Sequence, residues 1–249
     1  MVRIILCGAN GKMGKVIQSV VSAREDAEIV AGVDINTAPA PFPVYSDISE
    51  VNEEADVIID FTNPSLLCGL LNFATSKKIP VVIGTTGFDD QQKEQIKAAS
   101  EKTAVFFTYN MSIGVNLLAN LAKKAAQILS DDFDIEIIEK HHNQKIDAPS
   151  GTALMLADAI CEEIPEPMKY EYDRHSKREK RTKNEIGLHA VRGGTIVGEH
   201  EIIFAGRDEI ITLSHSARSK EIFAVGAVNA AVFMAGKDAG MYSMKEMIG

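Results

Sequence analysis

The first half of the chain alternates short apolar runs with amphipathic segments. The apolar runs predict buried strands at Val2–Cys7, Glu28–Val33, Val57–Asp60, Val81–Ile83 and Val105–Phe107. The segments between them predict helices from the glycine-rich stretch after Cys7 through Ala23, at Pro64–Lys77 and at Asp89–Glu101. Residues 36–43 hold three prolines and predict a loop. Strands that alternate with helices predict a parallel sheet with crossovers.

The pattern changes after Asn110. A helix is predicted over Val115–Leu129, with one apolar face formed by Leu117, Leu118, Leu121, Ala125 and Ile128. Phe133–Glu139 alternates apolar residues with the acidic Glu136 and Glu139, as a half-buried strand does, and Ala153–Glu163 predicts a helix. Three later segments predict an antiparallel or mixed sheet: Glu185–Ala190, Thr195–Phe204 and Glu209–Ser216. A small-residue helix over Ile222–Phe233 is expected to pack back on the first domain.

We therefore expect an α/β protein of two domains. Residues 1–112 with 220–249 form the parallel-sheet domain, and residues 113–219 form a smaller α+β domain with an open mixed sheet. The 249 residues are 45% apolar and can bury a substantial core.

Charge and cysteine usage narrow the class of protein. The 26 basic and 35 acidic residues give a net charge of −9, which argues against a nucleic-acid partner or an anionic membrane. The longest apolar stretch in the second half, residues 223–235, is too short to span a membrane. Cys7, Cys68 and Cys161 have unrelated spacings, which indicates thiols in a reducing cytoplasm and neither a disulfide framework nor a zinc site.

A glycine-rich loop follows the first strand and opens a helix. In such a loop the backbone approaches a pyrophosphate, and the helix start offers N–H donors. A glycine-rich turn without a ligand is the alternative, but Asp34 ends the second strand, where a carboxylate binds the adenosine ribose hydroxyls. The candidate cofactor residues of this end are Gly8, Ala9, Asn10, Gly11, Lys12, Met13 and Asp34. Asp34 repels a 2′-phosphate, so NADH is the expected cofactor, although Lys12 leaves NADPH open.

Two further segments follow predicted strands, at the edge where such sheets bind ligands. Gly84, Thr85 and Thr86 follow one strand, and Thr108, Tyr109, Asn110 and Met111 follow the next. Both segments suit ordinary loops, and both also suit a nicotinamide amide or a substrate carboxylate.

The residues with the clearest chemistry lie between positions 136 and 153. His141 and His142 end a predicted strand, where neighbours point to opposite sides, so they do not form a chelating pair and no metal is expected. Lys145 follows, and Ser150 is placed to cap a helix whose first amides, at Gly151 and Thr152, suit a carboxylate. One structural and one exposed histidine is the alternative. An imidazole, an ammonium and an anion site so close together favour acid–base chemistry on an anionic substrate.

This stretch, His-His-x-x-Lys-x-Asp-Ala-Pro-Ser-Gly-Thr, resembles the signature of the 4-hydroxy-tetrahydrodipicolinate reductase (dihydrodipicolinate reductase) family of diaminopimelate and lysine biosynthesis. The resemblance extends over most of the chain, through segments 8–14, 60–62, 84–87, 110–116, 192–200 and 226–231. It implies a Rossmann-like dinucleotide-binding domain, a substrate-binding and tetramerisation domain, and a homotetramer. The implied reaction is NADH- or NADPH-dependent reduction of a cyclic hydroxy-imine dicarboxylate with loss of water.

The resemblance also implies roles for residues. His141 is implied as proton donor and acceptor and Lys145 as the second proton donor. Substrate binding is implied for His142, Ser150, Gly151, Thr152 and Thr86. The chain departs from relatives in carrying Lys220 where many carry arginine, and Arg218 lies nearby as a substitute.

Three questions stay open at the level of sequence. The basic run 174–183 suits a solvated loop, a lid over an anionic ligand or a subunit contact. A dinucleotide-binding sensor without turnover is an alternative function, although it would not need His141 and Lys145. A different dehydrogenase of small amino-acid-like acids is another alternative.

Overall fold

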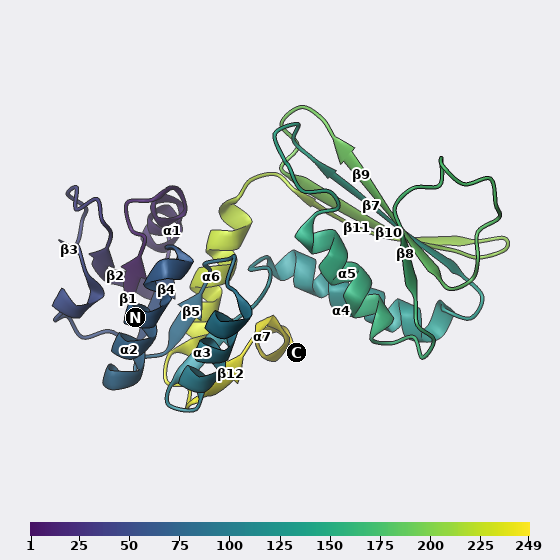
Figure 1. Ribbon diagram of the computed structural model, residues 1–249. Coiled ribbons are helices and arrows are strands. Elements are labelled where there is room, and N and C mark those ends of the chain that lie inside the picture. The colour runs from purple at the N-terminus through teal and green to yellow at the C-terminus, as the bar shows by residue number, and fades with distance from the viewer. The chain divides into compact units, whose positions relative to one another are not determined.

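The computed structural model describes residues 1–249 and divides the chain into two compact units (Figure 1). The first unit comprises Met1–Ser112 and Glu221–Gly249, and the second comprises Ile113–Lys220. A seven-stranded parallel sheet forms the first unit and a separate five-stranded mixed sheet forms the second. The predicted α/β class is therefore confirmed, including the mixed character of the second sheet.

The first sheet has the strand order of a dinucleotide-binding fold. Its strands are β1 (Val2–Cys7), β2 (Ala27–Val33), β3 (Val44–Tyr45), β4 (Val57–Asp60), β5 (Val81–Ile83), β6 (Ala104–Phe107) and β12 (Gly240–Tyr242). They lie in the order β12-β6-β5-β4-β1-β2-β3. The direction of the order reverses between β1 and β4, and ligands bind at such a point beyond the carboxyl ends of the strands.

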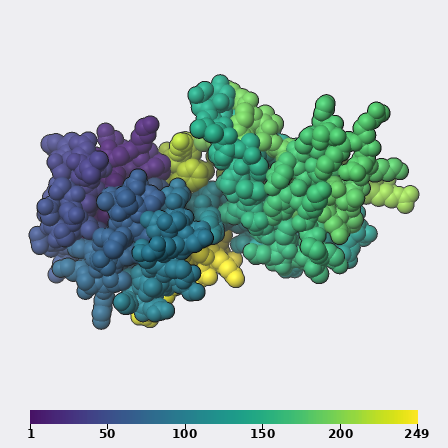
Figure 2. Space-filling model, in the orientation of Figure 1, coloured from purple at the N-terminus to yellow at the C-terminus, as the bar shows by residue number.

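Helices cover both faces of this sheet. They are α1 (Lys12–Ser22), α2 (Leu67–Lys77), α3 (Asp90–Ser100), α6 (Glu221–Met234) and α7 (Met244–Ile248), with 3₁₀ turns at Ile48–Glu50 and Pro64–Leu66. Ile4 and Ile5 are neighbours on β1 and point to opposite faces, yet both are fully buried. α1 packs against α6, and α2 packs against α3. The C-terminal residues, yellow in Figure 2, lie beside the blue residues of the first unit, where β12 pairs with β6.

The second sheet is covered on one face by two helices (Figure 1). Its strands lie in the order β11-β10-β7-β9-β8 and are β7 (Asp134–His141), β8 (Lys169–Glu171), β9 (Glu185–Arg192), β10 (Gly198–Ala205) and β11 (Ile210–Ala217). The helices are α4 (Ile113–Leu129) and α5 (Gly151–Cys161). Burial alternates along β7 and β10, so every second side chain of these strands faces the helices.

The predicted apolar face of α4 is only partly correct: Leu118 is buried and Ala125 packs against the core, but the other three residues do not. Leu117, Leu121 and Ile128 are about half exposed or more, at 51%, 48% and 68%. The buried side chains of this helix are Val115, Leu118, Ala119, Ala122 and Ala126. The small alanine side chains let α5 pack closely against α4. A pattern based on side-chain hydrophobicity favours the larger leucines and does not detect this packing.

Several boundaries also differ from prediction. The strand expected to end at Glu139 continues to His141, and the helix expected from Ala153 begins at Gly151. The helix predicted from Pro64 opens with a 3₁₀ turn before α2. β3, β8, β12 and α7 are two to five residues long, too short for hydrophobic periodicity to reveal. No helix is both long and apolar enough to cross a lipid bilayer.

Candidate active site

The loop after β1 brings backbone groups very close together. Gly8 has φ +81°, and a Cβ there would lie 2.5 Å from the carbonyl oxygen of Phe61. At Gly14 a Cβ would lie 2.1 Å from the carbonyl oxygen of Gly8. Helix α1 begins at Lys12 with no side-chain cap and no acidic residue in its first turn. The start of α1 therefore offers amide donors to an anion with no competing carboxylate of its own.

Asp34 lies just past the carboxyl end of β2 and ties two loops together. Its Oδ2 accepts from the Asn10 amide at 2.9 Å, and its Oδ1 accepts from the Asn36 amide at 2.9 Å. The Asn10 side chain in turn donates to the Asn36 carbonyl at 2.7 Å. This carboxylate keeps lone pairs for ligand hydroxyls while it holds the glycine-rich loop against the end of β2.

The loop after β5 contains one buried and one exposed threonine. Thr85 is buried, and its Oγ1 accepts from the Thr62 amide at 2.8 Å. Burial raises the pKa of the neighbouring Asp60, and hydrogen bonds from Thr62 and Thr85 oppose that rise. Thr86 is exposed at the same edge of the sheet. The two threonines thus differ: one holds the loop together, and the other is open to a ligand.

The loop after β6 presents a large aromatic side chain to solvent. Tyr109 is 77% exposed, whereas Met111 is buried. The Thr108 hydroxyl donates to the Asn110 carbonyl at 3.3 Å. Gly226 of α6 packs on this loop, because a Cβ there would lie 1.7 Å from the Met111 carbonyl oxygen. The backbone of the loop is therefore fixed from behind while Tyr109 remains accessible.

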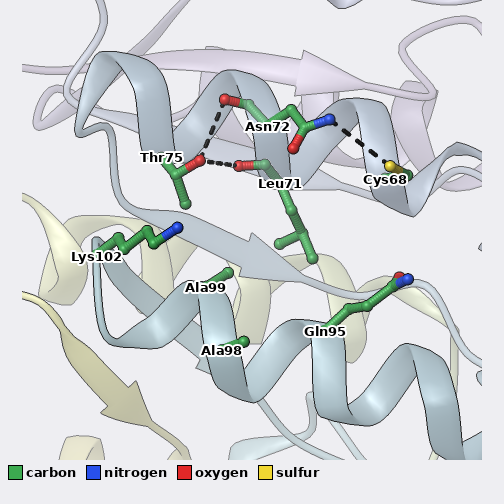
Figure 3. A pocket seen from close by; sticks show the side chains of 8 residues that line it. All are labelled: Cys68, Leu71, Asn72, Thr75, Gln95, Ala98, Ala99 and Lys102. Atoms are coloured by element: carbon green, nitrogen blue, oxygen red, sulfur yellow. Dashed lines mark hydrogen bonds between the residues drawn. The ribbon is translucent and has the colours of Figure 1, made fainter.

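A cavity of about 150 Å³ lies at the carboxyl ends of β1, β2 and β4. Residues from all three strand ends line it, including Cys7, Val33 and Asp60. A second hollow, of about 260 Å³, lies between α2 and α3 and includes Cys68 and Lys102 (Figure 3). That hollow contains none of the predicted site residues. The first cavity is the one at the edge where the fold binds ligands.

In the second unit, His141 and His142 point to different environments. His141 ends β7 and is 8% exposed, on the helix-covered face with Ile135 and Ile137. His142 is only partly buried. The Nδ1 of His141 lies 2.6 Å from Glu139 Oε2, whereas its Nε2 makes no hydrogen bond within the protein. Nε2 is therefore the ring nitrogen available to a ligand.

Glu139 is the carboxylate that binds His141, Ser150 and Arg192 in this region. The sequence pattern predicts it on the wrong face of the strand. It is fully buried on the face of Ile135 and Ile137, not on the outer face with Glu136. Arg192 of β9 binds both carboxylate oxygens, with Nη1 and Nη2 each at 2.7 Å. Burial works to raise the pKa of Glu139, but the hydrogen bonds from Arg192 and His141 outweigh it and leave the pKa below its ordinary value.

Lys145 lies in the loop between β7 and α5. Its Nζ pairs with Asp147 Oδ1 at 2.9 Å, and this hydrogen bond holds the pKa of Asp147 below its usual value. Arg192 Nη2 donates to the Asp147 carbonyl at 2.6 Å. The loop that carries Lys145 is therefore held by Arg192, the same residue that binds Glu139.

Ser150 caps α5 as the sequence predicts. Its Oγ accepts from the Ala153 amide at 3.2 Å, and its own amide donates to Glu139 Oε1 at 3.0 Å. The hydroxyl also lies 3.1 Å from His200 Nε2, and burial together with the neighbouring His141 lowers the pKa of His200 to about 4. Ser150 is 2% exposed, whereas Gly151 is exposed, so the open edge of the helix start is at Gly151.

Half of the six basic residues in the run 174–183 pair with carboxylates of their own unit. Arg174 pairs with Glu136 and Glu185, both at 2.9 Å. Arg181 pairs with Asp134 and with Glu136 on the outer face of β7. The segment is a mostly exposed loop, as the solvated-loop interpretation expects, but carboxylates of the sheet hold these two arginines.

Comparison with known proteins identifies the family. The model "Dihydrodipicolinate reductase, N-terminus" matches residues 2–111, and "Dihydrodipicolinate reductase, C-terminus" matches residues 114–248. The chain belongs to the dihydrodipicolinate reductase family. Its first unit is thus a Rossmann-type NAD(P)-binding unit, as the strand order and the glycine-rich loop indicate.

Relatives match the chain over its whole length. The 4-hydroxy-tetrahydrodipicolinate reductase of Caldanaerobacter subterraneus subsp. tengcongensis is 53% identical, over 100% of this chain and 98% of that protein. The enzyme of the same name from Clostridium tetani is 51% identical, over 100% and 97%. A solved dipicolinate-bound dihydrodipicolinate reductase from Paenisporosarcina sp. TG-14 is 28% identical, with a TM-score of 0.82 over 98% of this chain and 97% of that one.

Proposed function

We propose that this chain reduces 4-hydroxy-tetrahydrodipicolinate to tetrahydrodipicolinate in diaminopimelate and lysine biosynthesis. The balanced reaction consumes one NAD(P)H and one proton and releases NAD(P)⁺ and one water. The observation that carries the proposal is the 2.6 Å contact between His141 Nδ1 and Glu139, beside the anion-binding start of α5. Full-length similarity to reductases of that name supports turnover over an inactive sensor.

The residues of the first unit fit a nicotinamide dinucleotide. The close approach of Gly8 and Gly14 leaves room for a pyrophosphate beside the start of α1. Asp34 is proposed to bind the adenosine ribose, with the 150 Å³ cavity beside it for the adenine ring. When bound, the reduced nicotinamide supplies a hydride to a ring carbon of the substrate. The other proposed cofactor residues are Ala9, Asn10, Gly11, Lys12, Met13, Gly84, Thr85, Thr86, Thr108, Tyr109, Asn110 and Met111.

The second unit is proposed to bind the dicarboxylate. The backbone at Gly151 and Thr152 binds one carboxylate at the start of α5, and Ser150 shapes that start through its cap. His142 and Lys145 offset the remaining negative charge, and Thr86 is proposed as a further substrate-binding residue. Dipicolinate, which the solved relative binds, is proposed to bind here as well.

The proton chemistry is assigned to His141 and Lys145. Loss of the ring hydroxyl as water requires a proton donor, and hydride addition to the unsaturated ring requires protonation of a neighbouring atom. His141 Nε2 faces no protein partner and can donate and accept a proton. Lys145 stabilises developing negative charge and serves as the second donor.

A coupled assay tests the proposal. Dihydrodipicolinate synthase generates the unstable substrate in place, and oxidation of NADH or NADPH is followed at 340 nm. We expect oxidation that depends on the synthase and on this chain together. No oxidation by a chain that still binds NADH would contradict the proposal, and turnover of another small amino-acid-like acid instead would favour the other dehydrogenase.

We also propose that the chain is a cytoplasmic homotetramer assembled through the open faces of the mixed sheets. α4 and α5 cover one face only, and on the other face Ile138 and Ile203 are partly exposed. Ile210 and Ile211 of the edge strand β11 are 67% and 36% exposed. The three free cysteines fit a reducing compartment. Sedimentation equilibrium should give four times the chain mass, and a monomer mass would contradict the assembly.

A further inference from the structure

Glu139 is a buried carboxylate to which the reaction chemistry assigns no part. It is 0% exposed, and four hydrogen bonds reach it: one from His141, one from the Ser150 amide and two from Arg192. An isolated charge in the interior is costly and needs donors of this kind. Two guanidinium N–H groups and one backbone N–H can only donate, so Glu139 is held as an acceptor.

Because Glu139 can only accept hydrogen bonds, it determines which ring nitrogen of the neutral His141 carries the proton. Oε2 already receives Arg192 Nη1 at 2.7 Å, and it lies 2.6 Å from His141 Nδ1. A carboxylate in that state accepts a hydrogen bond from Nδ1, so the neutral ring carries Nδ1–H and leaves its lone pair on Nε2. The backbone of Gly198 faces that nitrogen, because a Cβ there would lie only 3.1 Å away.

Arg192 extends the same network to the other two parts of the site. β7 and β9 pair in parallel, with His141 opposite Arg192 in the register. Through Glu139 Oε1 the guanidinium joins the Ser150 amide at the start of α5. Through Nη2 it also binds the Asp147 carbonyl in the loop of Lys145. The Glu139–Arg192 ion pair therefore contacts His141, the start of α5 at Ser150 and the loop that carries Lys145.

We propose that Glu139, clamped by Arg192, is a positioning residue that selects the Nδ1–H tautomer of His141 and fixes that ring relative to the start of α5. This inference rests on the proposed function only in taking His141 as the proton-transfer group. Glu139 does not touch the substrate and does not transfer a proton. It acts through the orientation and the protonated nitrogen of the imidazole.

Glu139→Gln is the discriminating substitution. The amide has a similar shape but only one acceptor oxygen, whereas Arg192, Ser150 and His141 present four donors. If that oxygen serves Ser150 and Arg192 Nη2, the amide nitrogen faces His141 Nδ1. The ring must then accept there and carry its proton on Nε2, so the neutral ring has no lone pair on Nε2 with which to take up the proton that it passes to the substrate.

The tautomer can be measured without turnover. The chain has six histidines, so ¹⁵N-histidine labelling of the full chain gives a sparse spectrum, and the His141 signals are identified by their absence from His141→Gln. We expect the neutral wild-type ring to carry Nδ1–H and the Glu139→Gln ring to carry Nε2–H. An Nε2–H ring in the wild type, or an unchanged tautomer in Glu139→Gln, would overturn the inference.

Glu136→Gln is the matched control. Glu136 lies on the same strand and is also bonded to arginines and to a histidine, His189 at 2.7 Å, but it is on the outer face. The control should keep the His141 tautomer, and its kcat should stay within about twofold of wild type. Glu139→Gln should lose about 10²- to 10⁴-fold in kcat while NADH binding is kept.

A second variant guards against a failure of Glu139→Gln to fold. Arg192→Lys keeps the charge but cannot bridge both oxygens of Glu139 and the Asp147 carbonyl. We expect the Nδ1–H tautomer to remain, while KM for the dicarboxylate rises and kcat falls. Unchanged kcat and KM would overturn the positioning role of the ion pair. A wild type with the Nδ1–H ring but no reductase activity would instead contradict the proposed function alone.

Discussion

Gly198 of β10 lies against the one nitrogen of His141 that has no partner in the protein. A Cβ at position 198 would come within 3.1 Å of Nε2 and 3.5 Å of Cδ2. The other ring nitrogen is bonded to Glu139, so the imidazole cannot retreat without breaking that bond. The absence of a side chain at Gly198 therefore leaves space beside Nε2 of His141.

Gly198→Ala should consequently impair turnover more than stability. The added methyl group displaces the imidazole by a few tenths of an ångström, and a small misplacement of a reacting group costs about tenfold in kcat. Gly193→Ala is the control, since nothing lies within 4 Å of a Cβ there. Steady-state kinetics and thermal melts of both variants provide the test. Equal kcat values for the two variants would contradict the account.

Lys145→Met should weaken substrate binding and slow the reaction. A charged hydrogen bond to a carboxylate contributes about 1.5–3 kcal/mol, so KM should rise by roughly 10- to 100-fold. A fall in kcat as well is expected if the ammonium donates a proton. Lys140→Met is the control, because Lys140 pairs with Glu199 on the outer face, at 3.1 Å. A wild-type KM in Lys145→Met would exclude the assigned role.

The cofactor preference should follow Asp34. Its carboxylate suits ribose hydroxyls and repels a 2′-phosphate, so kcat/KM should be higher for NADH than for NADPH. Asp34→Ser should lower the NADH value and shift the ratio towards NADPH. The measurement is the ratio of the two kcat/KM values in each variant. A tenfold advantage for NADPH in the wild type would contradict the assignment.

Stability should fall in mild acid because of His200. Burial lowers its pKa from 6.5 to about 4 in the folded chain. The unfolded chain binds the proton first as the pH falls, so stability is full above pH 6.5 and is lost progressively towards pH 4. Between pH 7 and pH 5 this amounts to about 2 kcal/mol.

Urea unfolding at both pH values measures this contribution. His200→Gln should show a correspondingly smaller loss between pH 7 and pH 5, because it lacks the titrating group. His175→Gln is the control, since His175 is exposed. If His200→Gln and the wild type lost equal stability over that interval, the buried neutral state of His200 would be refuted.

The sequence was sufficient for those parts of the molecule that depend on local order. The sequence predicts Val2–Cys7 and Val57–Asp60 to the residue, because each run is apolar apart from Arg3 and ends where Gly8 or Asp60 interrupts it. The cap at Ser150 also depends only on local order, because the Ala153 amide that donates to its hydroxyl lies three residues away. These features need no knowledge of distant segments.

The ion pair of Glu139 and Arg192 was not predictable in that way. The two residues are 53 positions apart, and they meet because β7 and β9 pair in parallel with a particular register. The sequence does carry one signal: Glu139 shares the odd-numbered parity of Ile135, Ile137 and His141, which indicates an inward-facing side chain. In α4 the hydrophobic pattern favours Leu117 and Leu121, which are exposed, because it does not register the close packing that alanines allow between helices.

The most direct test of the central claim is the kcat of His141→Gln in the coupled reductase assay. NADH binding and dipicolinate binding should persist, because the glycine-rich loop and the start of α5 are unchanged. We predict that kcat falls by about 10²-fold or more, as expected for loss of a proton-transfer group. A kcat close to that of the wild type, with both ligands still bound, would contradict the claim that His141 carries the proton.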